Sequence, residues 1–299
     1  MSKPIKPVKK AIILAAGWGT RFLPLTKTMH KELLPVLNKP MIHYLAQEAS
    51  ASGIEEIILV ISPRKHDIIK YFSPNELLEK ELETKGKTTL LQAVLDTNNI
   101  ARVSVAIQTE QLGLGHAISI AAKMINNEPF AVILGDDLIE STVPAIKQLI
   151  KAYEQVGSSI IGVQTVDDDV IHKYGVVEPI NQAEKNQKLF KIKGAVEKPS
   201  LNEAPSNKAL LGRYVFTPAI MDILIKLHLQ WNKANGEMNV IDAFKELLLS
   251  EAIYAFEFEG SRYDLGGIEG FVKANIDLAI KHPEISEAIK KHIKNLKLC

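Results

Sequence analysis

The sequence predicts an α/β protein with a mixed, mainly parallel sheet and helices on both of its faces. Short, uniformly apolar segments alternate with longer helix-like segments over the first 166 residues. Such apolar segments are typical of strands buried on both faces. The alternation favours right-handed crossovers, which place helices on either side of parallel strands. The chain shows no internal repeat and no low-complexity linker, so a single domain is expected.

The first half of the chain is expected to contain five strands. Residues 11–16 are a continuous apolar run that stops at Gly17. Residues 54–62 are rich in β-branched side chains and are closed by Pro63, as is typical of a strand. The same reasoning predicts further strands over 103–108, 130–134 and 159–166.

Helices are expected between these strands. Residues 40–52 begin with proline, and Gly53 lies just past their end, as is common for a helix. A second helix is predicted over about 115–125, and a third before residue 159. Residues 75–95 read as a charged helical insertion that is interrupted at Gly86.

The pattern changes after about residue 167, where a more decorated C-terminal half begins. Short strand-like pieces are interspersed with two helices, and the last stretch is helical with a break at Pro283. The predicted strands are 174–177, 189–196, 210–216 and 253–259, and the predicted helices are 218–229, 237–250 and 268–298.

Composition excludes several classes of function. The chain has 299 residues, 46% of them hydrophobic, and 36 Lys and Arg against 35 Asp and Glu give a net charge of +1. A near-neutral chain has no bulk attraction for nucleic acid or an anionic membrane. The single cysteine, Cys299, excludes an internal disulfide. No apolar run reaches the length of a membrane span, and the N-terminus lacks the apolar region of a signal peptide, so a soluble cytoplasmic protein is expected.

A glycine turn follows the first predicted strand. The segment Gly17-Trp18-Gly19-Thr20-Arg21 lies where open parallel sheets bind ligands, beyond the carboxyl end of a strand. The spacing is neither the dinucleotide fingerprint, which needs a glycine at Phe22, nor a P-loop. Arg21, Lys27 and Lys31 add positive charge, so these residues alone allow either a polyphosphate site or a solvated basic loop.

Longer motifs decide between these readings. The segments 17–24 (Gly-Trp-Gly-Thr-Arg-Phe-Leu-Pro) and 31–36 (Lys-Glu-Leu-Leu-Pro-Val) resemble the signature of the sugar-1-phosphate nucleotidyltransferases. Five further segments resemble, in the same order, the bacterial UTP–glucose-1-phosphate uridylyltransferase branch of that family, and the resemblance runs from about Val8 to Ala279. These segments are 108–117, 135–137, 173–178, 197–199 and 211–214.

The resemblance implies a fold and a reaction. The fold is a Rossmann-like nucleotidyltransferase fold, with a nucleotide-binding half at about 8–166, a sugar-binding half at about 167–266 and C-terminal helices at about 267–299. In the reaction, the phosphate of glucose 1-phosphate attacks the α-phosphorus of UTP, giving UDP-glucose and pyrophosphate with Mg²⁺ as cofactor. Because the attacking group is already an anion, catalysis requires alignment and charge neutralisation rather than a protein nucleophile.

The resemblance also assigns charged residues to this reaction. Arg21 and Lys31 are expected to hold the triphosphate, and Lys198 the phosphate of the sugar, because guanidinium and ammonium groups bind phosphate oxygens. Nucleotide contacts are expected from the turn after the first strand and from two later positions. These residues are Ala15, Ala16, Gly17, Gly19, Thr20, Gln108 and Gly113. Without the resemblance, Gln108 would read as a polar residue that closes a strand.

Two carboxylates are expected to hold the metal and several residues the sugar. Asp136 and Asp137 end a predicted strand, and neighbours on a strand point to opposite sides, so the resemblance makes Asp136 a Mg²⁺ ligand and Asp137 a sugar contact. Asp264 is the second expected ligand; otherwise each of these acids reads as a cap or turn residue. The expected sugar contacts are Asp137, Gly175, Glu197, Gly212 and Arg213.

The sequence departs from the family pattern at three places, and two other functions stay open. His30 stands where proline is common, Trp18 where tyrosine or leucine is common, and residues 236–242 diverge, which puts their place beside the site in doubt. A thymidylyltransferase on the same fold is the nearest alternative. A non-catalytic sugar-nucleotide sensor is the other, although the charged residues needed for turnover are all present. The terminal helices are expected to support a homodimer or homotetramer.

Overall fold

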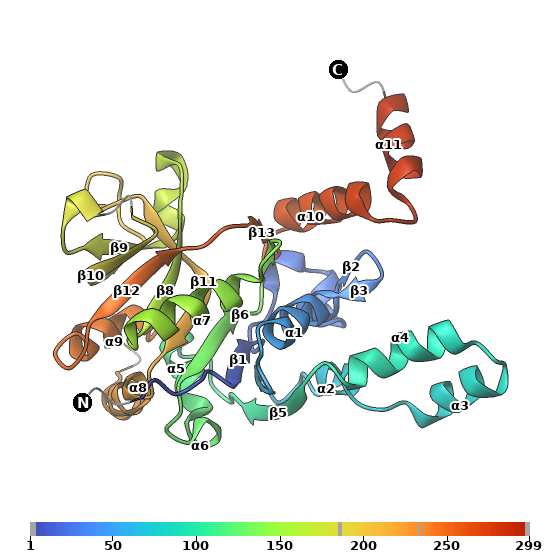
Figure 1. Ribbon diagram of the computed structural model, residues 1–299, viewed down its shortest axis with the longest axis horizontal. Coiled ribbons are helices and arrows are strands. Elements are labelled where there is room, and N and C mark those ends of the chain that lie inside the picture. Colours follow the sequence, from blue (N-terminus) through green and yellow to red (C-terminus); the bar gives the residue numbers. More distant parts are fainter. Residues whose placement is uncertain (1–3, 185–186, 233, 235, 297–299) are drawn as a thin grey trace.

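The computed structural model describes residues 4–184, 187–232, 234 and 236–296. Within these residues, the chain is organised around a nine-stranded sheet with the order β5–β4–β1–β6–β11–β8–β12–β10–β9 (Figure 1). The strands are β1 (Lys10–Leu14), β4 (Glu56–Ile61), β5 (Arg102–Ile107), β6 (Phe130–Leu134), β8 (Ile160–Thr165), β9 (Gly175–Pro179), β10 (Leu189–Glu197), β11 (Lys208–Phe216) and β12 (Ile253–Glu257).

The sheet is mixed. The pairings β5–β4, β4–β1, β1–β6 and β8–β12 are parallel, whereas β11 and β10 run antiparallel to their neighbours. Strand β11, from the second half of the chain, lies between β6 and β8 from the first. Leu14 pairs with Leu134, so β1 and β6 end side by side. The loops that follow these two strands are therefore neighbours at the edge of the sheet where ligands bind.

Helices cover both faces of the sheet, as predicted from the alternation of elements. One apolar cluster contains Phe216 of β11 and Phe244, and a second contains Ile13 of β1 and Leu149 on the opposite side. The helices of the first cluster are α5 (Leu114–Ile120), α8 (Ala219–Gln230) and α9 (Val240–Leu247), and those of the second are α1 (Met41–Ala51) and α7 (Ala145–Val156).

Two helical extensions leave this layered body. The predicted insertion forms a hairpin of two helices that turns at Gly86 and extends away from the sheet beyond β5 (Figure 1). The C-terminal stretch forms two helices on either side of Pro283 and extends from another side of the body. The bounds are α2 (Asp67–Tyr71), α3 (Glu76–Thr84), α4 (Thr88–Asn98), α6 (Ala122–Ile125), α10 (Ile268–Lys281) and α11 (Ser286–Asn295).

Some short elements were not predicted. Strand β6 ends at Leu134, and Asp137 begins a new strand, β7 (Asp137–Glu140), which pairs with β13 (Ser261–Asp264). The expectation that Asp136 and Asp137 end the preceding strand is therefore wrong. A second small pair, β2 (Pro35–Val36) and β3 (Lys39–Pro40), follows the signature loop, which itself folds into short 3₁₀ turns.

Helix α9 begins at Val240, three residues later than the predicted helix over 237–250. The Asp242 carboxylate accepts a hydrogen bond from the Asn239 backbone N–H at 2.8 Å, which fixes the start of the helix. No helix among the described residues is both long and apolar enough to cross a membrane. Cys299 lies outside the described residues.

Helix α1 carries a buried histidine that titrates abnormally. His43 is 6% exposed, and its Nδ1 lies 2.9 Å from the Tyr71 hydroxyl. Burial, with a contribution from Lys39, lowers the pKa of His43 to about 4. The folded state therefore holds this ring neutral at pH values where the unfolded chain would protonate it.

We expect His43 to make folding sensitive to mild acid. Its contribution to stability is complete above the unfolded pKa of about 6.5 and is lost as the pH falls toward 4. Between pH 7 and 4.5 the wild type should lose about 2 kcal/mol more than His43→Gln, at about 1.36 kcal/mol per pKa unit. Urea denaturation at the two pH values measures this. An equal loss in both proteins would show that His43 does not titrate as described.

Candidate active site

Two cavities meet at the ends of strands β1 and β6. The first, of about 390 Å³, is called the Asp137 cavity, and the second, of about 330 Å³, the Gln108 cavity. Leu114, Leu134 and Asp136 line both of them. Asp136 therefore lies at the junction, where a ligand in one cavity can approach a ligand in the other.

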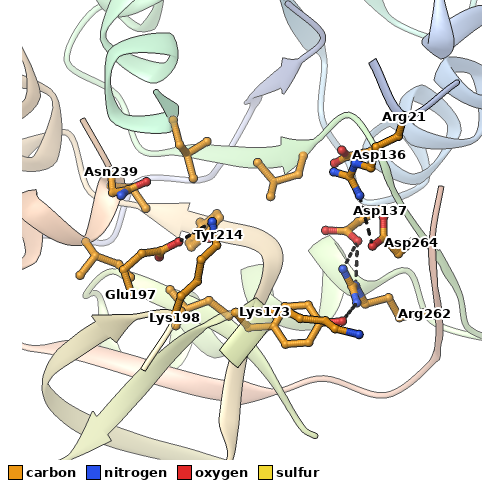
Figure 2. A pocket seen from close by; sticks show the side chains of 17 residues that line it. Arg21, Asp136, Asp137, Lys173, Glu197, Lys198, Tyr214, Asn239, Arg262 and Asp264 are labelled. Carbon is orange, nitrogen blue, oxygen red and sulfur yellow. Dashed lines mark hydrogen bonds and ion pairs between the residues drawn. The ribbon is translucent and has the colours of Figure 1, made fainter. Parts of the chain in front are cut away.

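Most of the predicted site residues line one cavity or the other, although they come from distant parts of the chain. Of the predicted nucleotide contacts, four lie on the Gln108 cavity, and of the predicted sugar contacts, three lie on the Asp137 cavity. The Gln108 cavity is lined by Ala16, Gly17, Lys31, Gln108 and Gly113, and the Asp137 cavity by Arg21, Asp137, Gly175, Glu197, Lys198 and Asp264. In Figure 2 the aspartates and two arginines gather at one end, and Glu197 and Asn239 lie at the other.

Asp136 is held by an ion pair. The Nζ atom of Lys31 lies 2.9 Å from its Oδ2 atom. Burial would raise the pKa of Asp136, but the positive charges of Lys31 and Arg21 outweigh this effect and keep the pKa below its usual value. Asp136 is therefore an anion at neutral pH.

The position of Lys31 depends on a second ion pair beneath it. Lys65 Nζ lies 2.8 Å and 2.7 Å from the two carboxylate oxygens of Glu32, and it also donates to the Ala15 carbonyl at 2.8 Å. Both side chains are almost fully buried. This contact ties the 3₁₀ turn that carries Lys31 to the end of β1. Because a buried charge is stable only when it is paired, the contact fixes the turn in place.

Asp264 faces Asp136 across a glycine. A Cβ atom built on Gly266 would lie 2.8 Å from Asp136 Oδ2 and 2.9 Å from Asp264 Oδ1. The two oxygens are therefore at most 5.7 Å apart, the sum of these distances. Arg21 Nη1 lies 3.9 Å from Asp264 Oδ2. The same Cβ would lie 3.2 Å from Arg21 Nη2, so a side chain at position 266 would press on both carboxylates and on the guanidinium beside them.

This arrangement can hold a divalent cation only if a ligand supplies further oxygens. Two carboxylates face one space, and among the described residues no group of three or more Asp, Glu, His or Cys side chains is arranged so that it could hold a metal ion by itself. Mg²⁺ is bound in this way in many phosphate sites, through one or two carboxylates, phosphate oxygens and water. The donor set of Asp136 and Asp264 therefore fits Mg²⁺ in the presence of a bound polyphosphate.

Asp137 is buried and held by Arg262, which the sequence reasoning did not identify. Arg262 Nη2 lies 2.6 Å from Asp137 Oδ1, and Nη1 donates to the Tyr174 hydroxyl at 3.0 Å. Burial raises the pKa of Asp137 to about 6, although Arg262 opposes the shift. The sequence did contain a signal for Arg262. It lies two residues before the predicted ligand Asp264, and residues two apart on a strand point to the same side.

Gly212 makes room for Asp137. Its φ is +64°, which a residue with a side chain rarely adopts, and a Cβ atom there would lie 2.5 Å from Asp137 Oδ2. The glycine thus shapes the cavity from behind the aspartate, although it does not line it.

The structure contradicts the expected sugar contact of Arg213. Its side chain is completely buried and pairs with Glu48 of α1, with Nη2 2.7 Å from Oε2. The same nitrogen donates to the Asp137 carbonyl at 2.7 Å. Arg213 therefore supports the backbone of Asp137 from inside the protein and lines neither cavity.

Ala15 is fully buried and lines neither cavity, and its N–H donates to the Val60 carbonyl while its own carbonyl accepts from Lys65. Its contact with a nucleotide stays a prediction. Thr20 lies on a third cavity, and His30 lies there with it. A backbone contact from Thr20 or Gly19 to a nucleotide stays a prediction.

Glu197 is the last residue of strand β10, and Lys198 follows it. The Lys198 backbone has a φ of +46°, and its N–H donates to the Tyr174 carbonyl at 3.0 Å. Its side chain is 63% exposed, with Nζ 3.5 Å from Glu197 Oε1. A left-handed backbone at a residue other than glycine is strained and is frequent at binding sites. This backbone directs a mobile cation to the mouth of the Asp137 cavity.

Gln108 is oriented by a buried histidine. Its Nε2 atom lies 2.9 Å from His116 Nδ1. Burial lowers the pKa of His116, and the nearby His228 lowers it further. The ring is therefore neutral, and its Nδ1 can accept the amide hydrogen. The amide oxygen of Gln108 is then available as an acceptor. A nucleobase N–H is the kind of donor that it could bind.

The divergent segment 236–242 does lie beside the site. Met238 N–H donates to the Leu112 carbonyl at 2.6 Å, and Gly115 N–H donates to the Met238 carbonyl at 2.8 Å. These bonds place Glu237 on the Gln108 cavity and Asn239 on the Asp137 cavity. The doubt raised by the unusual sequence there is resolved, and neither residue had been predicted.

Comparison with known proteins gives a family and a set of relatives. The family model described as nucleotidyl transferase matches residues 10–281. The chain is 48% identical over 292 residues to a Staphylococcus epidermidis protein named UTP--glucose-1-phosphate uridylyltransferase, covering 98% of this chain and 99% of the relative.

Two solved structures are also similar. A UTP-bound UGPase from Acinetobacter baumannii superposes with a TM-score of 0.86 at 33% identity, covering 97% of this chain and all of the other. A UDP-glucose pyrophosphorylase complexed with UDP-glucose superposes with a TM-score of 0.80 at 35% identity, covering 92% and 100% of the two chains.

We expect Arg213→Leu to destabilise the fold by about 3–5 kcal/mol, because it leaves the Glu48 carboxylate buried without its partner. The double variant Arg213→Leu/Glu48→Gln should recover part of this loss, since it removes the buried charge and keeps an acceptor for the Ile146 N–H. Urea denaturation measures both. A loss of ligand binding in Arg213→Leu at unchanged stability would instead restore the predicted sugar contact.

Proposed function

The chain belongs to the nucleotidyl transferase family, and from this we propose that it transfers the uridylyl group of UTP to glucose 1-phosphate. The products are UDP-glucose and pyrophosphate. An oxygen of the sugar phosphate attacks the α-phosphorus of UTP, the bond from that phosphorus to the bridging oxygen breaks, and pyrophosphate leaves. The names of the 48% identical relative and of the structures holding UTP and UDP-glucose support this reaction.

One observation carries the proposal. Asp136 lies where the Gln108 cavity and the Asp137 cavity join, so each cavity can hold one substrate with its phosphate beside the same carboxylate. A reaction between two phosphate groups requires this kind of meeting point, because most of its barrier is lowered by alignment.

The charged residues around the junction then have separate tasks. Lys31 and Arg21 bind the triphosphate and neutralise charge on the departing pyrophosphate. Lys198 binds the phosphate of the sugar through its mobile ammonium group. Asp137 and Glu197 accept hydrogen bonds from sugar hydroxyls, and Arg262 keeps the Asp137 carboxylate in position. Gln108 reads the base through its amide oxygen.

We propose Mg²⁺ as the cofactor, held by Asp136 and Asp264. When bound, the ion would neutralise the negative charge that the two phosphate groups bring together. The two carboxylates on either side of Gly266 support this assignment, since they leave room for a small cation and contribute few ligands themselves.

We also infer the organisation of the chain. The β5–β4–β1–β6 part of the sheet, with three parallel pairings, supports a Rossmann-like nucleotide half within one domain. The exposed apolar residues of α10, and Ile285 and Leu296 at the two ends of α11, support contacts between subunits of a homodimer or homotetramer. A cytoplasmic location fits a reaction on soluble nucleotides and sugar phosphates.

The two alternatives are less well supported. A thymidylyltransferase reading would need a site that accepts the C5-methyl group and lacks a partner for the 2′-hydroxyl. A putative glucose-1-phosphate thymidylyltransferase from Bacillus anthracis superposes at only 23% identity, which shows the fold alone. A non-catalytic sensor could dispense with Lys31, Asp136 and Asp264, yet all three stand together at the junction.

Activity with each pair of substrates tests the function. Pyrophosphate release should be measured with UTP, dTTP, ATP and GTP against glucose 1-phosphate and other hexose 1-phosphates. We expect the highest kcat/KM for UTP with glucose 1-phosphate. A clear preference for dTTP would assign the thymidylyl reaction. Binding of UDP-glucose without turnover in any combination would assign the sensor.

Gly266→Ala tests the space between the carboxylates. The added methyl group would lie under 3 Å from Asp136 Oδ2 and Asp264 Oδ1, so we expect kcat/KM to fall by about 100-fold. Gly267→Ala is the matched control, since a Cβ there meets nothing within 4 Å. Both variants should unfold like the wild type. Equal activity in the two would show that the space does not matter.

A further inference from the structure

A third cavity lies beside the signature loop and takes no part in the proposed reaction. It measures about 690 Å³ and is called the Trp18 cavity. Neighbouring loop residues divide between the cavities: Trp18, Thr20 and His30 line this one, whereas Gly17 and Lys31 line the Gln108 cavity. The signature loop therefore separates the Trp18 cavity from the active site.

The two residues at which this sequence departs from the family signature, Trp18 and His30, both line the Trp18 cavity. The guanidinium carbon of Arg64 lies 3.3 Å from the centre of the Trp18 ring, which is a close cation–π stack. Stacking orders the guanidinium plane and leaves the N–H donors at its edge. An ordered guanidinium of this kind binds phosphate oxygens in pairs.

The charge of the Trp18 cavity is positive and uncompensated. Lys27 and Arg64 line it, and neither makes an ion pair with another residue in the described part of the chain. No described carboxylate lines the cavity. Lys65 also reaches it, but Glu32 neutralises that ammonium group. Two full positive charges therefore face a cavity large enough for a nucleotide-sized anion.

Hydroxyl groups complete the polar part of the lining. Thr20, Thr26 and Thr28 contribute three of them, of which Thr26 already donates to the Gly19 carbonyl at 2.8 Å. A guanidinium, an ammonium and threonine hydroxyls are together the donors that a group with several phosphate oxygens requires. A single carboxylate or monophosphate would leave part of this set unused.

We propose that the Trp18 cavity is a second binding site, separate from the active site, for a diphosphate group. The group is either free pyrophosphate or the diphosphate of a nucleotide. Arg64 binds it bidentately from its stack on Trp18, and Lys27 binds it from the opposite part of the loop. The site does not depend on the uridylyl transfer reaction, because none of its charged residues touches the junction at Asp136.

Trp18 provides a direct readout of binding. The chain has two tryptophans, so Trp231→Phe leaves Trp18 as the only one. In this background, titration with pyrophosphate in the absence of divalent metal should change the fluorescence to saturation. Calorimetry on the wild type should give two pyrophosphates per chain at saturation. Titrations with UDP and with inorganic phosphate identify which source of the anion binds more tightly.

Substitutions separate this site from the active site. Arg64→Gln should raise the Kd for pyrophosphate, measured through Trp18 fluorescence, at least tenfold, and Arg64→Lys should raise it less. Lys147→Gln, which removes an exposed charge on α7, is the matched control and should change the affinity less than twofold. Arg21 lies on the Asp137 cavity, so Arg21→Gln should also leave this Kd within twofold of the parent value.

Three results would overturn the proposal. Trp18 fluorescence could fail to respond to millimolar pyrophosphate or UDP. Arg64→Gln could titrate like its parent, or Arg21→Gln could abolish the response, in which case Trp18 reports the active site. Inorganic phosphate could bind as tightly as both diphosphates, which would exclude a diphosphate site. Because each readout is binding without turnover, failure here is distinct from failure of the uridylyl transfer reaction.

Discussion

The ion pair between Lys31 and Asp136 sets the geometry on which the rest of the site depends. It joins a 3₁₀ turn of the signature loop to Asp136, the second residue after β6, which lines both cavities. Lys31 is held in turn by the buried Glu32–Lys65 pair, which also bonds the end of β1. Breaking the buried Glu32–Lys65 pair would leave an uncompensated charge in the interior, so this contact resists rearrangement, whereas the Lys31–Asp136 pair is partly exposed on the cavities. The parallel pairing of β1 with β6 brings these elements together.

Ion pairs also support the Asp137 cavity, where the sugar is proposed to bind. Asp137 is held at its carboxylate by Arg262 and at its carbonyl by Arg213, which is itself paired with Glu48 of α1. The acids therefore keep their positions before any ligand binds. A reaction between two phosphate groups needs such prearranged charge more than it needs a nucleophile or a base. This explains how the site can function with no catalytic cysteine, serine or histidine.

Much of the fold could be predicted from the sequence, and most of the predicted site residues line one of the two cavities, for identifiable reasons. Strand β6 coincides with the predicted 130–134, because a run of only five apolar residues bounded by Pro129 and Gly135 favours a buried strand over a helix. The error at Arg213 has a physical cause. Every residue of β11 is buried, so alternation of polarity cannot tell its faces apart, and the pairing with β8 is irregular between Leu210 and Tyr214, where Gly212 has a positive φ. The partner Glu48 lies 165 residues away, a distance that no local pattern spans.

The central claim is that Asp136 and Asp264 share one cation between the two substrates. Binding of Mn²⁺, followed by electron paramagnetic resonance in the presence of UTP, tests it most directly. The account predicts that Asp136→Asn and Asp264→Asn each weaken Mn²⁺ binding at least tenfold and that the double variant binds little more weakly than either, while Asp168→Asn, at an exposed position, changes nothing. Binding of Mn²⁺ with wild-type affinity in both single variants would contradict it.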